Sequence, residues 1–213
     1  MLYMTLSGEW ALSPLDDPSD LHKGTVPGSV YSFLLADGGM EDPYWRDNEL
    51  RSMDLMMKDW AFDREFEVTD EIASCPLVEL DCQGLDTIAD IYVNGMHVGY
   101  ADNMHRHWSF PVTSMIHEGA NHIRVVIHSP VRYMRNLDEK DHWGGSRYAM
   151  RGFPHIRKAS CMFGWDWGPR LPDMGIWREI GIRGVDSARI TDWRVSQQHE
   201  DGLVRLSFSV EQE

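Results

Sequence analysis

The sequence contains few cysteines and few basic residues, and it has no long apolar run. Its 3 Cys cannot all pair within the chain, and none has a His or Cys neighbour at zinc-finger spacing. Lys and Arg number 20 against 34 Asp and Glu, which gives a net charge of −14 that repels phosphate backbones. A membrane span requires a stretch of about 18 apolar residues, and the sequence contains none. We therefore expect no nucleic-acid partner and no membrane partner, and no motif predicts a metal or a cofactor.

Signals for export are also missing from the sequence. Met1–Met4 has no basic flank followed by an apolar stretch, and no Asn-x-Ser/Thr sequon occurs in the chain. An odd number of Cys without a signal peptide is typical of reduced thiols. The sequence therefore predicts a cytoplasmic protein.

The composition is that of a globular protein with an excess of Trp. Hydrophobic residues make up 42% and charged residues 25%, which excludes a disordered or collagen-like chain. The chain has 9 Trp. So many indoles serve either a large core or a surface that stacks against sugars.

Strand patterns dominate the first 130 residues. Residues 59–68 place Trp60, Phe62, Phe66 and Val68 on one face, which predicts a half-buried strand. Residues 89–93 also alternate and run into Asn94-Gly95, a strong hairpin signal, before 97–100. Further strands are expected at 123–127 and 176–183, and a single short helix at 30–35 between Ser29 and Gly38.

Many short strands joined by turns favour an all-β protein, an antiparallel β-sandwich rather than a parallel sheet. Residues 130–175 interrupt this rhythm because they show no clean periodicity. A long aperiodic stretch inside a compact domain is usually functional, since loops carry sites on a rigid scaffold.

The last 26 residues start a new pattern. Residues 188–197 and 203–210 predict a hairpin about Glu200-Asp201-Gly202. Two strands alone are marginally stable. We therefore expect residues 186–213 to begin a second, truncated sandwich domain after a first domain at 1–185.

The most unusual segment is Phe163-Gly-Trp-Asp-Trp-Gly-Pro-Arg170, in which two indoles flank a carboxylate. Gly164, Gly168 and Pro169 disfavour a regular strand, so a bent loop is expected. An ionised carboxylate accepts hydrogen bonds from sugar hydroxyls while an indole covers the apolar face of the ring. The structural alternative is a pair of buried Trp, with Asp166 capping a turn or pairing with Arg170.

This segment, followed by Gly175-Ile-Trp-Arg178, closely resembles the N-terminal domain of β-mannosidases in glycoside hydrolase family 2. The resemblance extends in family order over about residues 8–183. Its further blocks are Val26–Val30, Asp42–Glu49, Gly84–Thr87, Tyr92–Gly95, Asn103–Arg106 and Ile156–Lys158. The chain departs from the family at Cys161 and at Met53–Met57, which affects only local packing.

The resemblance implies a galactose-binding-like jelly-roll domain, followed by an immunoglobulin-like sandwich and a catalytic (β/α)8 barrel. It also implies that Trp165, Asp166 and Trp167 contact a terminal β-mannoside of an oligosaccharide. Both catalytic Glu of the family lie on the barrel, so no catalytic residue is expected here. A retaining glycosidase needs two carboxylates about 5–5.5 Å apart, and acid pairs such as Glu41-Asp42 are expected by chance among 34 acids. The fragment alone is therefore expected to be inactive.

Several other residues have both a functional and a structural interpretation. His105 and His107 fit a metal site or a salt-bridged surface. Arg46, Asp47 and Asn48 are expected to fix a loop through side-chain-to-backbone bonds. Arg157 and Lys158 either pair with Asp166 and orient it or are solvated.

Two other functions compete with the β-mannosidase domain. One is a free-standing carbohydrate-binding module, which the unfinished hairpin at the end of the sequence disfavours. The other is the same domain of a related enzyme such as an exo-β-glucosaminidase.

Overall fold

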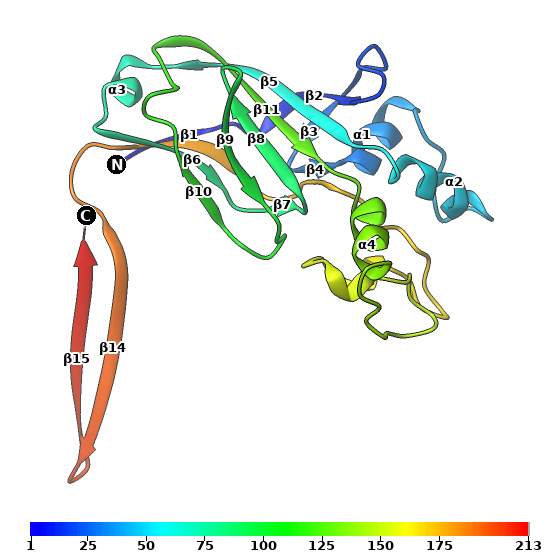
Figure 1. Cartoon of the computed structure of the whole chain (residues 1–213). Helices are drawn as coiled ribbons and strands as arrows, with labels where there is room; N and C mark the ends of the chain where they lie inside the picture. The colour runs from blue at the N-terminus through cyan, green and yellow to red at the C-terminus, as the bar shows by residue number, and fades with distance from the viewer. Residues whose placement is uncertain (213) are drawn as a thin grey trace.

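The computed structural model describes residues 1–212 and shows a sandwich of antiparallel sheets (Figure 1). The larger sheet has the order β3 (His22–Val26), β2 (Gly8–Pro14), β5 (Trp60–Val68), β11 (Gly119–Ile127), β8 (Ala89–Val93), β9 (Met96–Ala101). The smaller sheet has the order β1 (Leu2–Thr5), β13 (Ile180–Val185), β6 (Leu77–Cys82), β10 (Trp108–Pro111). A third sheet joins β4 (Gly28–Ser29), β12 (Gly175–Ile176) and β7 (Leu85–Asp86). The predicted all-β sandwich is confirmed.

Alternation along the strands builds the core between the two main sheets. Trp60 and Phe62 of β5 and Ile91 of β8 are fully buried, and so are Leu80 of β6 and Ile182 of β13. Because successive side chains of a strand point to opposite faces, each strand gives one apolar row to this core.

The strand predictions are confirmed for 59–68, 89–100 and 123–127. The turn of the β8–β9 hairpin has Asn94 at φ 49° and Gly95 at φ 78°, as a two-residue turn of this kind requires. The single strand predicted at 176–183 is wrong. The structure divides it into β12 and β13, because residues 177–179 leave the ladder and only Gly175 and Ile176 pair with β4 and β7.

The helix predicted at 30–35 is confirmed as α1 (Val30–Asp37), with a Ser29–Ser32 capping box and a left-handed Gly38. The expectation of only one helix is wrong, since the chain also forms α2 (Asn48–Leu55), α3 (Asp70–Ala73) and α4 (Pro130–Asp138). Helix α4 begins inside the stretch 130–175. Ser129 caps its first turn and Pro130 occupies its first position, where the missing N–H costs nothing. Two 3-10 turns, η1 (Phe153–His155) and η2 (Ser160–Met162), follow.

A buried ion pair joins the aperiodic segment to the third sheet. The fully buried Lys158 ammonium donates to the Asp86 carboxylate of β7 and to the carbonyl of Asp173, just before β12. The alternatives expected for Lys158, pairing with Asp166 or solvation, are therefore wrong. Arg157 is exposed, and its carbonyl accepts a hydrogen bond from the Met104 amide at 3.0 Å.

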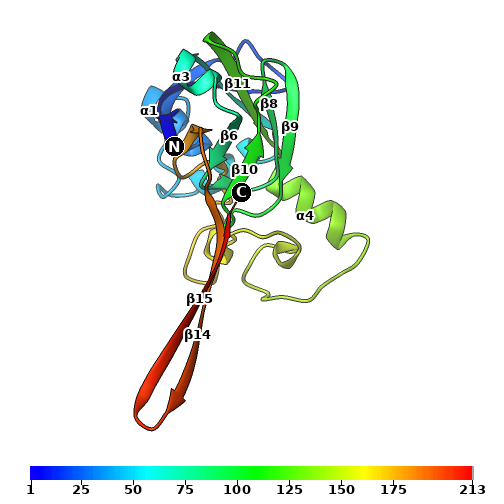
Figure 2. The same ribbon diagram turned by 90° about the vertical axis from the view of Figure 1, so that its left-hand side faces the viewer.

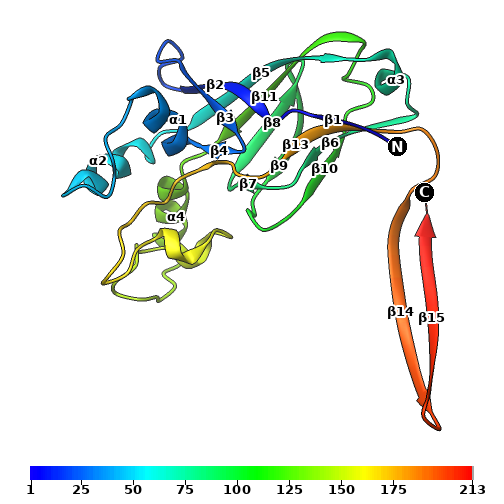
Figure 3. The ribbon, with the colours of Figure 1, turned by 180° about the vertical axis from the view of Figure 1, so that it is seen from behind.

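The predicted C-terminal hairpin is confirmed as β14 (Ile190–Glu200) and β15 (Leu203–Gln212). It extends from one end of the sandwich, while α4 and the segment after it lie at the other end (Figures 1 and 3). Seen from the side in Figure 2, the hairpin extends well beyond the sandwich. One of its faces is apolar and exposed, with Trp193, Val204, Leu206, Phe208 and Val210.

None of the helices within residues 1–212 combines the length and the apolar character that crossing a membrane would require.

Burial predicts the effect of truncating two phenylalanines. Phe62 is fully buried and packs edge-on against Phe33 at 5.4 Å between ring centroids, whereas Phe208 of β15 is 69% exposed. We expect Phe62→Ala to lower the free energy of unfolding by about 3–5 kcal/mol. Phe208→Ala serves as the matched control and changes it by less than about 0.5 kcal/mol. Urea denaturation of both variants measures this difference, and equal losses would contradict the core assignment.

The carboxyl group of Asp173 predicts a pH effect. Burial raises its pKa from 3.8 to about 6, although the amides of Tyr31 and Met174 donate to it. Because the folded-state pKa exceeds the unfolded one, this group adds stability below about pH 4, and the addition is lost as the pH rises through 6.

Asp173→Asn keeps an acceptor for both amides and removes the titration. The stability of the native protein relative to this variant should therefore fall by on the order of 1–3 kcal/mol between pH 4 and 7. Denaturant midpoints of both proteins across this range provide the test. Other titrating groups cancel in the difference, so parallel curves would mean that Asp173 has an ordinary pKa.

Candidate functional site

The N-terminal end of α4 is fixed to the large sheet by the carboxylate of Asp59. This carboxylate accepts from the Ser129 amide at 2.7 Å and from Arg132, and His128 lies 3.5 Å away. Burial disfavours the charged form, but these hydrogen bonds outweigh it and hold the pKa of Asp59 well below its usual range. His128 also pairs with Asp90 at 2.8 Å, and these two carboxylates raise its pKa. The ionised carboxylate of Asp59 therefore fixes the first turn of α4 beside the large sheet.

A small second core holds the segment that follows α4. Its buried members are Ile88, Met134, Ile156 and Phe163. The partly buried Tyr133, Met150 and Phe153 pack against them. Because Met134 lies on α4 and Phe163 precedes the Trp-Asp-Trp loop, this cluster ties the loop to the helix.

The loop at 163–170 is a tight, bent turn, as expected from its glycines. Phe163 and Arg170 form an isolated antiparallel bridge, and the Trp165 amide donates to the Gly168 carbonyl at 3.1 Å. Gly164 has φ +82°, and a Cβ there would lie 2.5 Å from Cγ of Arg170. A glycine is therefore required at this position. The turn places Asp166 and Trp167 at its tip.

The three side chains at 165–167 are exposed to solvent. Trp165 is 46% exposed and Trp167 is 83% exposed. Asp166 is exposed as well, and its side chain has no hydrogen bond or ion pair with residues 1–212. Arg170 instead donates to the Tyr148 carbonyl at 3.5 Å. The structural alternative, with buried Trp and a capping or Arg-paired Asp166, is therefore wrong. The loop therefore presents the free Asp166 carboxylate between a half-exposed indole and a largely exposed one.

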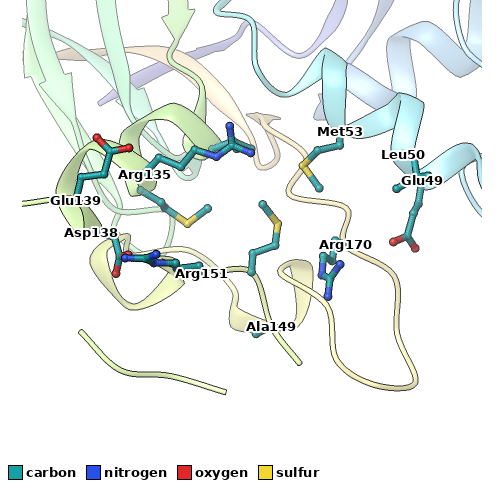
Figure 4. Close-up of a pocket in the computed structure, with 12 residues that line it drawn as sticks. Glu49, Leu50, Met53, Arg135, Asp138, Glu139, Ala149, Arg151 and Arg170 are labelled. Atoms are coloured by element: carbon teal, nitrogen blue, oxygen red, sulfur yellow. The ribbon is translucent and has the colours of Figure 1, made fainter. Parts of the chain in front are cut away.

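Next to the loop lies a pocket of ≈ 540 Å³ between α2, α4 and the segment 149–151 (Figure 4). Arg170 borders it and connects it to the loop. Its lining combines apolar side chains, such as Met53, with charged ones, such as Arg135. This pocket was not predicted from the sequence because α4 was not, although Ser129-Pro130 is a start signal for a helix.

Among the other candidates, Asn48 and His107 have structural roles. The Asn48 side chain donates to the Asp42 carbonyl at 2.9 Å, which fixes the loop before α2 as expected. Asp47 gives no side-chain cap to α2, and the Arg46 guanidinium lies over the Trp45 ring at 5.5 Å. The predicted side-chain-to-backbone bonds are therefore wrong for these two residues. Nε2 of His107 pairs with the buried Asp81 at 2.5 Å, in line with the salt-bridged interpretation. Residues 1–212 contain no group of three His, Cys, Asp or Glu placed to hold a metal ion.

The sequence matches a known family over most of its length. The model of the glycosyl hydrolase 2 galactose-binding domain-like family matches residues 10–178. The β-mannosidase of Mus musculus is 32% identical over 198 residues, which cover 87% of this chain and 22% of that protein. The β-mannosidase of Bos taurus is 29% identical over 216 residues, which cover 98% of this chain and 24% of that protein. The chain thus spans less than a quarter of the length of these relatives.

Solved structures agree with this assignment. The β-D-mannosidase of Dictyoglomus thermophilum superposes with a TM-score of 0.91 at 31% identity, covering 100% of this chain and 26% of that one. The exo-chitosanase of Amycolatopsis orientalis gives a TM-score of 0.70 at 18% identity, covering 100% and 24%, and shows the shared fold. The match of the family model over residues 10–178, together with a sandwich that superposes on these enzymes, shows that the chain belongs to the glycosyl hydrolase 2 galactose-binding domain-like family.

Proposed function

We propose that this chain is the non-catalytic N-terminal domain of an exo-acting, retaining β-mannosidase and that Trp165, Asp166 and Trp167 contact the terminal mannose. The observation that carries the proposal is the free Asp166 carboxylate between two exposed indoles. An exposed, unpaired acceptor contributes nothing to folding, whereas a sugar supplies the hydroxyls that it lacks. The identity of about 30% to β-mannosidases supports mannose as the sugar.

In this proposal the chemistry belongs to another part of the enzyme. A retaining glycosidase uses a nucleophile and an acid/base about 5–5.5 Å apart, and the family resemblance assigns both to a catalytic barrel. The chain corresponds to 22–26% of its relatives, and the proposal is that it lends one wall to an active site built mainly by that barrel. Its partners are then the β-mannoside and the downstream domains of its own protein. We retain the cytoplasmic location as a prediction from the Cys content.

The hairpin is consistent with a second domain that starts at residue 186. Val210 and Phe208 of β15 lie opposite Trp193 and Val195 of β14, while Leu206 and Val204 lie opposite polar residues. One face of the hairpin is therefore largely hydrophobic and uncovered. A β-sandwich covers such a face with a second sheet. We therefore propose that residues 186–213 contribute the first strands of an immunoglobulin-like sandwich.

Two alternatives remain distinguishable by experiment. A free-standing carbohydrate-binding module would bind sugar without any further domain. An exo-β-glucosaminidase domain would act on another sugar, but the 18% identity to the exo-chitosanase shows only the fold. Hydrolysis of a panel of aryl β-mannosides and β-glucosaminides by the full-length enzyme separates the last alternative from the proposal.

Mannose binding by this chain alone is expected to be weak. A single wall of a pocket buries too little of a sugar to hold it, since ligand sites enclose most of their ligand. Calorimetric titration with mannose should give no heat at concentrations up to the millimolar range. A micromolar dissociation constant would instead identify a free-standing binding module.

Asp166→Ala tests the substrate contact in the full-length enzyme. Each charge-assisted hydrogen bond to a sugar hydroxyl is worth about 1.5–3 kcal/mol, so kcat/KM should fall by at least roughly 10- to 1000-fold. Asp166→Asn keeps the shape and should lose less. The melting temperature should change little, because an exposed acceptor adds little to folding.

The exposed Asp54 of α2 provides the matched control, and Asp54→Ala should leave kcat/KM unchanged. Activity of Asp166→Ala near that of the native enzyme, or a loss that only follows a collapsed melting temperature, would show that Asp166 does not contact the substrate.

A further inference from the structure

Both ends of the segment that precedes the Trp-Asp-Trp loop pair with one buried carboxylate. Asp138, in the last turn of α4, is 3% exposed, and it accepts from Nδ1 of His142 at 2.9 Å and from Nε of Arg151. Both donors are largely exposed, while their common acceptor is buried. Residues 142–151 therefore form a loop whose two ends meet at Asp138, and we name this loop the brace. Figure 4 shows Arg151 beside Asp138 at the edge of the pocket.

The geometry around Asp138 is tight. Gly152 follows the brace with φ +85°, and a Cβ there would lie 2.9 Å from the Met134 carbonyl and 3.2 Å from Cβ of Asp138. Burial disfavours ionisation of Asp138, but the hydrogen bonds from His142 and Arg151 outweigh it and lower its pKa. The carboxylate therefore stays charged near neutral pH and keeps both donors.

The brace contacts the Trp-Asp-Trp loop at two points. The Met150 amide donates to the Phe163 carbonyl at 2.9 Å, directly before the loop. The Tyr148 ring lies 6.0 Å from the Trp165 ring, centroid to centroid, at an interplanar angle of 45°. This is the one ring contact of Trp165 with residues 1–212. Without it, the half-exposed indole would have no ring neighbour among these residues to select one of its rotamers.

Tyr148 is itself held in place. The Arg147 guanidinium lies 4.7 Å from the centre of its ring, and Arg170 donates to its carbonyl from the far end of the Trp-Asp-Trp loop. The backbone amide of Tyr148 is also held, because it donates to Oγ of Ser146 at 3.2 Å. A contiguous set of contacts thus runs from the buried Asp138 to the Trp165 indole.

We propose that Asp138 and Tyr148 are positioning residues, which fix the Trp165 indole, and with it Asp166, in the orientation that meets the substrate. Only the role in substrate binding rests on the proposed function, because the fixed orientation of the indole is a property of this chain. Neither residue touches the sugar. Ordering the loop before binding spares the entropy that a mobile loop would lose on contact.

Hydrogen exchange of this chain tests the brace without any substrate. In Tyr148→Ala, the amides of 163–168 should exchange several-fold faster, while those of β5 and β11 keep their rates. Tyr148→Phe retains the ring and loses only the hydrogen bond that the hydroxyl accepts from the exposed Arg147, so the amides of 163–168 should exchange at nearly the native rate. Tyr3→Ala is the control, since Tyr3 is a 43% exposed ring on β1 at the other end of the sandwich. Asp138→Asn should speed exchange in both 142–151 and 163–168.

Kinetics of the full-length enzyme supply the second measurement. Tyr148→Ala should lower kcat/KM by about 3- to 10-fold, the scale of one aromatic pair, and Tyr148→Phe should restore it. Unchanged exchange at 163–168 in Tyr148→Ala, or kinetics equal to those of Tyr3→Ala, would overturn the inference. If Asp166→Ala has full activity, the proposed function fails, and the exchange experiment still decides on the brace. If Asp166→Ala is defective while Tyr148→Ala is not, only the brace is wrong.

Discussion

The buried ammonium of Lys158 is the contact on which the end of the molecule that carries the Trp-Asp-Trp loop depends. Taking a charge out of water costs several kcal/mol, and only a close partner offsets this cost. Asp86 of β7 supplies that partner, and the carbonyl of Asp173 accepts a second bond. Since residues 158 and 173 flank the excursion that carries Asp166, the same ammonium closes this excursion and fastens it to the sheet. Loss of the pair would leave Asp86 charged and buried, so the loop and the fold share one constraint.

Two neighbouring loops therefore use the same device. Residues 159–172 are closed on the buried cation of Lys158, and residues 142–151 are closed on the buried anion of Asp138. Each replaces a regular ladder of backbone hydrogen bonds with a few charged ones, which are stronger and directional. The two loops meet through the hydrogen bond between Met150 and Phe163. This arrangement connects a region that has almost no helix or strand to the sheet and to α4 through a few specific contacts.

The periodic part of the chain was predictable because alternation is a local property. Trp60, Phe62 and Phe66 specify a strand whatever surrounds them, and Asn94-Gly95 specifies the turn of its own hairpin. The aperiodic part depends on partners far away in sequence. From the sequence alone Lys158 is expected at the surface, because its partner Asp86 lies 72 residues earlier and comes beside it only in the folded chain. Helix α4 was missed for a different reason, because residues 130–175 were treated as one aperiodic stretch and Ser129-Pro130 was not used as the start signal of a helix.

The Trp-Asp-Trp loop was singled out by its composition, and its exposure follows from a different physical argument. A folding sequence buries most of the surface of its large aromatics, and departures from this rule concentrate at functional sites. Trp10 and Trp60 obey the rule, since both are buried and their Nε1 atoms donate to backbone carbonyls. Trp167 does not, since it is 83% exposed, and the Asp166 carboxylate beside it has no donor among residues 1–212. Because the scaffold beneath them is held by buried charges, their exposure cannot be attributed to a loosely packed loop. A ligand, or another part of the same protein, that covers the indole and donates to the carboxylate accounts for the exposed Trp167 and the unpaired Asp166 together.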